Sequence, residues 1–212
     1  MMKKSISVFA AAVIAASMAA SVSAADYSRN PGYDLPPASA SGTVNKNDNT
    51  PAPGKSLTNP LEIIEKKNIK TAVAKGEPVY ASYETAQLKA NAMNMLAGKD
   101  GGVLTVVTKR YTAVIDGDSV TKAKDISLAI KMTKSRAQGA MVLRTEQQDS
   151  FGCTVDIHIS AKYYTQCGIN LKTAHVYYVD KDKNVNDMGA LNFDDDGNIV
   201  VSMTEGGKYI IM

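Results

Sequence analysis

The sequence predicts a mainly β protein, an antiparallel β-sandwich with one helix near the start of the domain. After about residue 102, apolar and polar residues alternate with a period of two, which is typical of strands that bury one face. Turn-forming residues separate these short runs at intervals of roughly 8–12 residues. Many short strands with this spacing indicate two packed antiparallel sheets.

The N-terminus has the three-part pattern of a secretory signal peptide. Lys3 and Lys4 precede an apolar stretch, and Val22 and Ala24 occupy the small-residue positions of a cleavage site. The apolar stretch is short for a membrane span, which takes roughly 20 residues. We therefore expect residues 1–24 to be removed and the protein to be secreted, either extracellular or associated with the cell surface. We expect no membrane association after cleavage.

Residues 25–60 have the composition of a disordered linker. They contain six of the seven prolines, with Ser, Asn, Thr and Gly between them and no apolar periodicity. Such a segment cannot bury enough apolar surface to offset its ordering entropy. It is either a spacer or a tolerated tail, and the sequence leaves both open. Residues 61–212 are long enough for one core, and we expect one β-sandwich domain there.

The charge pattern argues against a nucleic-acid-binding protein. Residues 1–24 contain two lysines and no acidic residue, so their removal lowers the net charge from +3 to +1. The remaining lysines are interleaved with Asp and Glu along the chain, whereas nucleic-acid binding calls for a clustered basic surface.

One helix is predicted between Ser82, as the N-cap, and Gly98, as the C-terminal stop. Apolar residues recur between them at three- and four-residue spacing: Leu88, Ala92, Met95 and Leu96. The neighbouring methionines are expected to fill the core rather than to bind metal.

Strands follow from residue 103. The stretch "VLTVVTKRYTAVIDGDSV" contains two strand-like runs, and Asp116-Gly117 predicts a hairpin turn. "DISLAIKM" places its apolar residues on one face, and so does "FGCTVDIHIS". The runs "AHVYYVD", "ALNFD", "NIVVSM" and "KYIIM" complete the series.

Four of these segments occur in a recognisable order: "GDSVTKAKDISLAIKM", "SFGCTVDIHIS", "AHVYYVDKDKNVNDMGALNFDDDGNIVVSM" and "GGKYIIM". Together they resemble a β-rich module that occurs, often in repeats or at C-termini, in secreted and cell-surface proteins of Gram-positive anaerobic bacteria. The resemblance covers residues 80–212 and implies a non-catalytic extracellular domain. The chain departs from that pattern at Cys153, where Phe is usual, and at Cys167.

The acidic cluster Asp194–Asp196 invites comparison with a calcium-binding loop. An EF-hand-like loop needs acidic ligands at positions 1, 3 and 5, Gly at 6 and Glu at 12. Counted from Asp194, Gly197 is at position 4, so the spacing does not fit. Short apolar runs flank the cluster on both sides, and Asp and Gly suit a tight turn. The sequence predicts a hairpin turn over residues 194–198.

The two histidines allow a further hypothesis. Asp156 and His158 share the polar face of one strand, and His175 is in a later strand. If those strands were neighbours, the three side chains could form a metal or acid–base cluster. The sequence favours separate, solvent-exposed polar residues, and we predict no metal site.

The two cysteines, Cys153 and Cys167, are predicted to form a disulfide, because an exported protein encounters oxidising conditions. The closed loop would be about 15 residues and would stabilise the fold by roughly 3 kcal/mol. The alternative is a pair of buried free thiols.

No catalytic motif is recognisable, and we expect no catalytic residues, no cofactor and no enzyme activity. The first functional hypothesis is a non-catalytic structural or interaction module of an exported bacterial protein, with a cell-envelope protein or polysaccharide as its partner. The alternative is a carbohydrate-binding module that uses exposed tyrosines, since the chain has ten Tyr and no Trp. The candidate binding residues are Tyr163, Tyr177, Asp156, His158 and His175.

Overall fold

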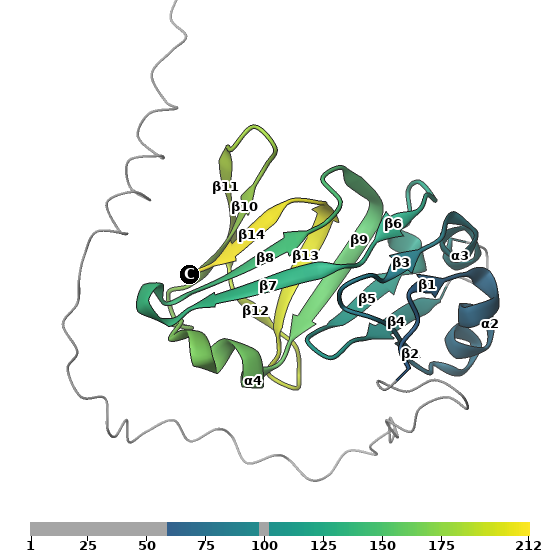
Figure 1. Cartoon of the computed structure of the whole chain (residues 1–212), viewed down its shortest axis with the longest axis horizontal. Helices are drawn as coiled ribbons and strands as arrows, with labels where there is room; N and C mark the ends of the chain where they lie inside the picture. The colour runs from purple at the N-terminus through teal and green to yellow at the C-terminus, as the bar shows by residue number, and fades with distance from the viewer. Residues whose placement is uncertain (1–58, 98–101) are drawn as a thin grey trace, which may run out of the picture. The chain divides into compact units, whose positions relative to one another are not determined.

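Three β-sheets and a few short helices make up the part of the chain that the computed structural model describes, residues 59–97 and 102–212 (Figure 1). The prediction of a mainly β, sandwich-like fold is confirmed. The predicted signal peptide and nearly all of the predicted linker lie outside the described residues. Among the described residues, no helix is long and apolar enough to cross a membrane.

The first large sheet has five strands: β7 (Ile130–Ser135), β8 (Ala140–Thr145), β10 (His175–Val179), β11 (Val185–Ala190) and β14 (Lys208–Ile211). Their order in the sheet is β11-β10-β14-β8-β7, and every neighbouring pair is antiparallel. The β10–β11 hairpin projects beyond the rest of the sheet (Figure 1).

The second large sheet has six strands: β2 (Val79–Tyr80), β4 (Val103–Val107), β5 (Thr112–Asp116), β9 (Ser150–Ile159), β12 (Asn192–Phe193) and β13 (Ile199–Glu205). Their order is β12-β13-β9-β5-β4-β2. All pairs are antiparallel except β2 with β4, which is parallel.

The third sheet is small and is formed by β1 (Ile63–Ile64), β3 (Gln87–Leu88) and β6 (Ile126–Ser127). The helices are α2 (Lys66–Lys75), α3 (Ala90–Leu96) and α4 (Ala161–Tyr164), with three short 3-10 turns, η1 (Gly117–Ser119), η2 (Arg136–Gln138) and η3 (Thr165–Cys167). In Figure 1, α2 and α3 lie at the end of the domain opposite the turn between β7 and β8.

The core lies between the two large sheets. Along β9 the alternation predicted from the sequence is present, with Val155, Ile157 and Ile159 buried and His158 half-buried. From the five-stranded sheet, Leu143 contributes to the same hydrophobic cluster. The period of two therefore decides which side chains face the core in both sheets.

The predicted helix is shorter than expected. It begins only after Lys89, not after Ser82, and its bounds are those of α3. Gln87 and Leu88 form β3 instead, because they pair with β1 on one side and β6 on the other. The preceding helix α2 was not predicted, although Glu65 and Asn68 form a capping box at its N-terminus.

The hairpin turn predicted at Asp116-Gly117 is wrong. The β4–β5 turn lies earlier, at Thr108–Tyr111, where the Thr108 hydroxyl donates to the Tyr111 carbonyl at 2.7 Å. Gly117 begins η1 and packs tightly under α3, where a Cβ would lie 2.1 Å from the carbonyl oxygen of Leu96. Position 117 therefore needs glycine because the backbone of α3 approaches it closely, and not because a hairpin turn lies there.

The structure does not contain the predicted disulfide, and Cys153 and Cys167 are buried free thiols. Cys153 is near the start of β9, whereas Cys167 follows α4, beyond the end of that strand. The carbonyl of Gly168 lies beside Gly139, at the β7–β8 turn. The six residue steps along the strand from Cys153 to Ile159 span about 20 Å, so the two cysteines lie toward opposite ends of the sandwich.

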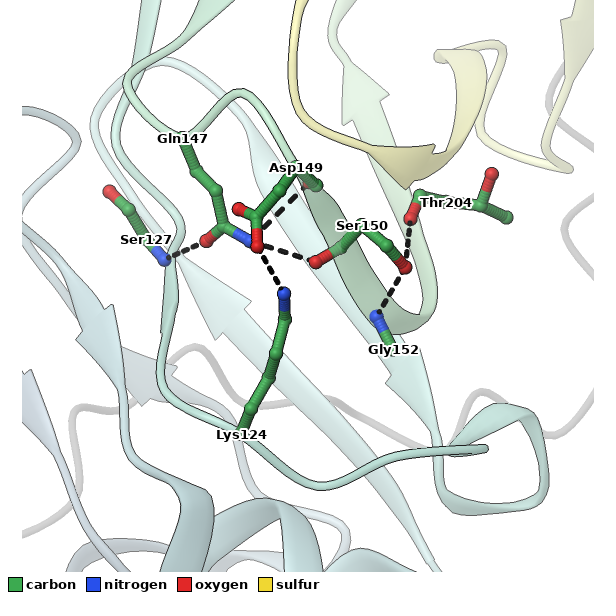
Figure 2. Close-up of polar contacts among 7 residues, drawn as sticks. All are labelled: Lys124, Ser127, Gln147, Asp149, Ser150, Gly152 and Thr204. Carbon is green, nitrogen blue, oxygen red and sulfur yellow. Dashed lines mark hydrogen bonds and ion pairs between the residues drawn. The ribbon is translucent and has the colours of Figure 1, made fainter.

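A polar network fixes the segment that joins β8 to β9 (Figure 2). The Gln147 side chain accepts a hydrogen bond from the backbone N–H of Ser127 and donates one to the carbonyl of Ser150, both at 3.0 Å. Asp149 forms an ion pair with Lys124 at 2.6 Å, and the hydrogen bond from Lys124 lowers the pKa of the Asp149 carboxyl. These contacts tie the end of β8 to the small sheet and to β9.

Candidate functional site

Three basic residues form a row across the outer face of the five-stranded sheet. Lys131 on β7 lies directly opposite Arg144 on β8, and Arg144 lies directly opposite Lys208 on β14. Lys131 and Arg144 are exposed and Lys208 is half-buried. We call Lys131, Arg144 and Lys208 the cationic row.

Such a row is unfavourable in the free protein. Like charges directly opposite each other on antiparallel strands repel, because their Cβ atoms are only about 4.5–5.5 Å apart. Among the described residues, none of the three forms an ion pair with a carboxylate. The row therefore carries three positive charges, none of which has a direct ion-pair partner among the described residues.

A less polar row lies beside the cationic row on the same face. Cross-strand pairing places Thr133, Val142, Ile210 and Tyr177 in line on β7, β8, β14 and β10. Val142, Ile210 and Tyr177 are half-buried. The face thus combines positive charge with apolar surface, as in sites that bind amphipathic ligands.

A cleft of about 550 Å³ opens at the β7 end of the cationic row. Lys131 and Arg144 line it, together with Arg110 from the β4–β5 turn and Tyr83 from the segment before β3. The Arg110 guanidinium stacks on the Tyr83 ring, with its Cζ 4.3 Å from the ring centroid. Arg110 is thereby oriented into the space that Lys131 and Arg144 also line.

Two carboxylates share the cleft with these cations, Glu84 and Glu146. Glu84 accepts a hydrogen bond from the Tyr83 hydroxyl at 2.7 Å, and this bond raises the pKa of Tyr83. Glu146 accepts one from the Ser127 hydroxyl at 3.2 Å. Both carboxylates thus have neutral partners, and the three cations of the cleft outnumber them.

The end of β8 is held rigidly, which sets the direction of Arg144. Thr145 is 4% exposed; its hydroxyl donates to the Gln147 carbonyl and accepts from the Gly207 N–H, each at 2.6 Å. Because Thr145 points inward, alternation along the strand turns Arg144 outward. Figure 2 shows the adjoining Gln147 and Asp149 contacts that complete this support.

Two of the predicted binding residues lie together on this face. His175 and Tyr177 point outward from β10 with their rings stacked, 6.2 Å between centroids. His175 also pairs with Asp187 of β11 at 2.9 Å. Several hydrogen bonds to the Asp187 carboxyl lower its pKa, led by the one from the Gly189 N–H and followed by the one from His175.

Tyr163 lies at the edge of the same sheet. Its hydroxyl donates to the Lys109 carbonyl, and the Lys134 ammonium lies 4.9 Å from its ring centroid. The Lys162 ammonium lies 6.0 Å from the same centroid. Tyr163 therefore stands among further cations beside β7.

Asp156 and His158 lie elsewhere, on the six-stranded sheet, so the structure does not bring them together with His175. His158 instead pairs with Asp194 at 2.7 Å. Asp156 Oδ1 is buried and has no hydrogen-bond partner. In the described part of the chain, no three His, Cys, Asp or Glu side chains are grouped closely enough to hold a metal ion.

The predicted hairpin turn at Asp194–Asn198 is confirmed. Asp194 Oδ1 accepts from the backbone N–H groups of Asp196 and Asn198, at 3.1 and 2.8 Å. The Asn198 side-chain amide donates to Asp194 Oδ2 at 2.8 Å. The turn joins β12 to β13.

The cationic row was not predicted from the sequence, because its members are far apart along the chain. Each is surrounded by residues of other kinds, and only the strand register places them side by side.

Comparisons with protein-family models, with curated proteins and with solved structures found no match for this chain. Fold and site together define a mainly β, sandwich-like protein with a cationic sheet face.

Proposed function

We propose that this chain is a non-catalytic interaction module of an exported protein, and that it binds a cell-envelope component through the outer face of the five-stranded sheet. The signal-peptide pattern of residues 1–24 supports export. The resemblance of residues 80–212 to an extracellular β-rich module supports a non-catalytic role.

The observation that carries this proposal is the cationic row. Placing Arg144 between Lys131 and Lys208 costs stability in the free protein, by roughly 0.2–1 kcal/mol for each opposed pair. A fold that needed only solubility would gain from acidic residues interspersed among these three. An anionic partner seated on the row removes the repulsion, so binding accounts for the arrangement.

Sugar binding through a row of exposed tyrosines has less support. The half-buried tyrosines are scattered, and other groups pack against their rings: Arg110 on Tyr83, Lys134 and Lys162 on Tyr163, His175 on Tyr177, and Tyr209 on Tyr178. Flat stacking on a sugar needs an open aromatic face, and each of these rings already has a neighbour.

The test is retention of the purified protein on the insoluble envelope fraction of the cells that produce it. The triple variant Lys131→Gln/Arg144→Gln/Lys208→Gln should be retained less strongly than the native chain. The matched control is Lys66→Gln/Lys70→Gln/Lys75→Gln, which makes the same change in net charge on α2, a helix that packs on α3, β2 and β4. Equal retention of the native chain and the row variant would overturn the proposal.

A further inference from the structure

We infer that the ligand of this face is an acidic polysaccharide, whose acid groups lie along the cationic row and in the adjoining cleft. This inference rests on the proposed function and names the chemical class of the ligand. Its starting point is that Lys131 and Arg144 belong to both features: they are the first two members of the row and they also line the cleft.

The row and the cleft therefore form one continuous anion-binding site. Arg110 is at its inner end, stacked on Tyr83, and Lys208 is at its outer end, on β14. A guanidinium group can bind a carboxylate or sulfate through two parallel hydrogen bonds (bidentate binding), whereas an ammonium group acts as a point charge. The site thus offers two arginines at the cleft and lysines on either side of Arg144.

The spacing of the cations favours a chain with repeated acid groups. Neighbouring strands are about 4.7–4.9 Å apart, so the three cations are spread over roughly 10 Å perpendicular to the strands. A single small anion cannot reach both Arg110 and Lys208. A polymer that crosses β7, β8 and β14 can place successive acid groups at each cation.

The neighbouring row favours a sugar backbone. Val142 and Ile210 provide a half-buried apolar surface beside the cationic row. The two faces of a pyranose ring carry C–H groups that lie well on such a surface, while acid substituents at the ring edge reach the cations. A surface with positive charges beside apolar side chains is therefore complementary to a sugar chain that carries carboxylates or sulfates.

A nucleic acid fits less well. Duplex binding that depends on phosphate contacts commonly uses about 6–10 of them. The row and cleft together supply four cations, and Glu84 and Glu146 lie beside them. An acidic polysaccharide carries less charge per unit length and suits this smaller number.

The experiment is affinity electrophoresis of the purified protein in native gels that contain polygalacturonate, dextran sulfate, neutral dextran or double-stranded DNA. We expect retardation by polygalacturonate, by dextran sulfate or by both, and the responding polymer identifies the acid group. The row variant should lose about tenfold in affinity, because three exposed charge contacts are removed. The α2 control variant should migrate as the native chain does.

Three outcomes would overturn the inference: no retardation by either acidic polysaccharide, equal retardation by DNA, or equal retardation of the native chain and the row variant. The first of these leaves the proposed function intact if the envelope fraction still retains the native chain and loses the row variant. The experiments therefore distinguish an error in the inferred ligand class from an error in the proposed binding face. Circular dichroism of each variant shows whether it is folded.

Discussion

Lys183 and Gly197 occupy the same position in two copies of one turn. Both have the left-handed backbone conformation, with φ of 65° and 75°. In one copy Asp180 is bonded to Asn184, and in the other Asp194 is bonded to Asn198, through the same carboxylate and amide groups. The segments "DKDKN" and "DDDGN" thus form equivalent turns, between β10 and β11 and between β12 and β13.

The first prediction follows from that equivalence. Lys183→Gly should stabilise the protein by about 1 kcal/mol, because a left-handed conformation costs roughly 1–2 kcal/mol for residues with a Cβ. Gly197→Lys should destabilise it by a similar amount, since open space around Gly197 leaves the backbone as the main cost. Urea unfolding of the two variants is the measurement. A loss of stability in Lys183→Gly would contradict the prediction.

The two turn aspartates should differ in importance. Asp194→Ala should cost about 2 kcal/mol and Asp180→Ala clearly less, because Asp194 also pairs with His158. Asp195→Ala is the control, since Asp195 is exposed and makes none of these bonds. Equal losses of unfolding free energy for Asp194→Ala and Asp195→Ala would show that the hydrogen bonds of Asp194 contribute nothing to stability.

Thermal melts of the native chain with calcium and with a chelator should agree, as expected of a turn that binds no metal.

Acid should remove the contribution of Asp194. Partial burial acts to raise the pKa of its carboxyl, but hydrogen bonds from His158 and Asn198 outweigh it and hold the pKa below its ordinary value. The ionised form is therefore favoured in the folded state. Its contribution is complete above the unfolded pKa of about 3.9 and is lost as the pH falls through the lower folded pKa.

The corresponding measurement compares the native chain with Asp194→Asn. The difference in unfolding free energy should be largest above about pH 5 and should shrink below about pH 4. A difference that stays constant down to about pH 2 would refute the assignment. Asp195→Asn serves as the matched variant outside the bonded network.

Repulsion within the cationic row should be visible in the free protein. Arg144→Gln removes the middle charge, which belongs to both opposed pairs, and should raise stability by roughly 0.4–2 kcal/mol at low salt. The gain should vanish near 1 M salt, where the screening length is about 3 Å. Lys70→Gln, on the exposed face of α2, is the comparison. A clear loss of stability at low salt would mean that packing of the Arg144 stem outweighs its charge.

The two thiols should react only when the protein unfolds. Burial raises the pKa of Cys153 to about 11 and also raises that of Cys167, so both are protonated and inaccessible in the folded state. An alkylating reagent should modify neither in the native protein and both after denaturation without reductant. A mass that shows no alkylation until reductant is added would reveal a disulfide instead.

Local chemistry was predictable from the sequence. Alternation along β9 identified Val155 and Ile157 as core residues, because successive side chains of a strand must point to opposite faces. The turn at Asp194–Asn198 was also predictable, since its bonds lie within five consecutive residues. Both features depend on neighbours in the chain and need no tertiary information.

Features that depend on which strands become neighbours were not predictable. Ser82 has the character of a helix N-cap, yet pairing of Gln87 and Leu88 with β1 and β6 delays the helix to α3. Cys153 and Cys167 are near in sequence, but the length of β9 carries them apart. Strand pairing involves many long-range bonds at once and outweighs a single local preference.

By itself, the sequence determined the mainly β class, the buried face of β9 and the turn chemistry at Asp194. Only the tertiary structure decided the cationic row, because Lys131, Arg144 and Lys208 become neighbours through the register of β7, β8 and β14. A shift of one residue in either pairing would turn these side chains toward the opposite face. Register is set by the whole hydrophobic pattern and the turns together, so the charges that define the face cannot be located from any one strand.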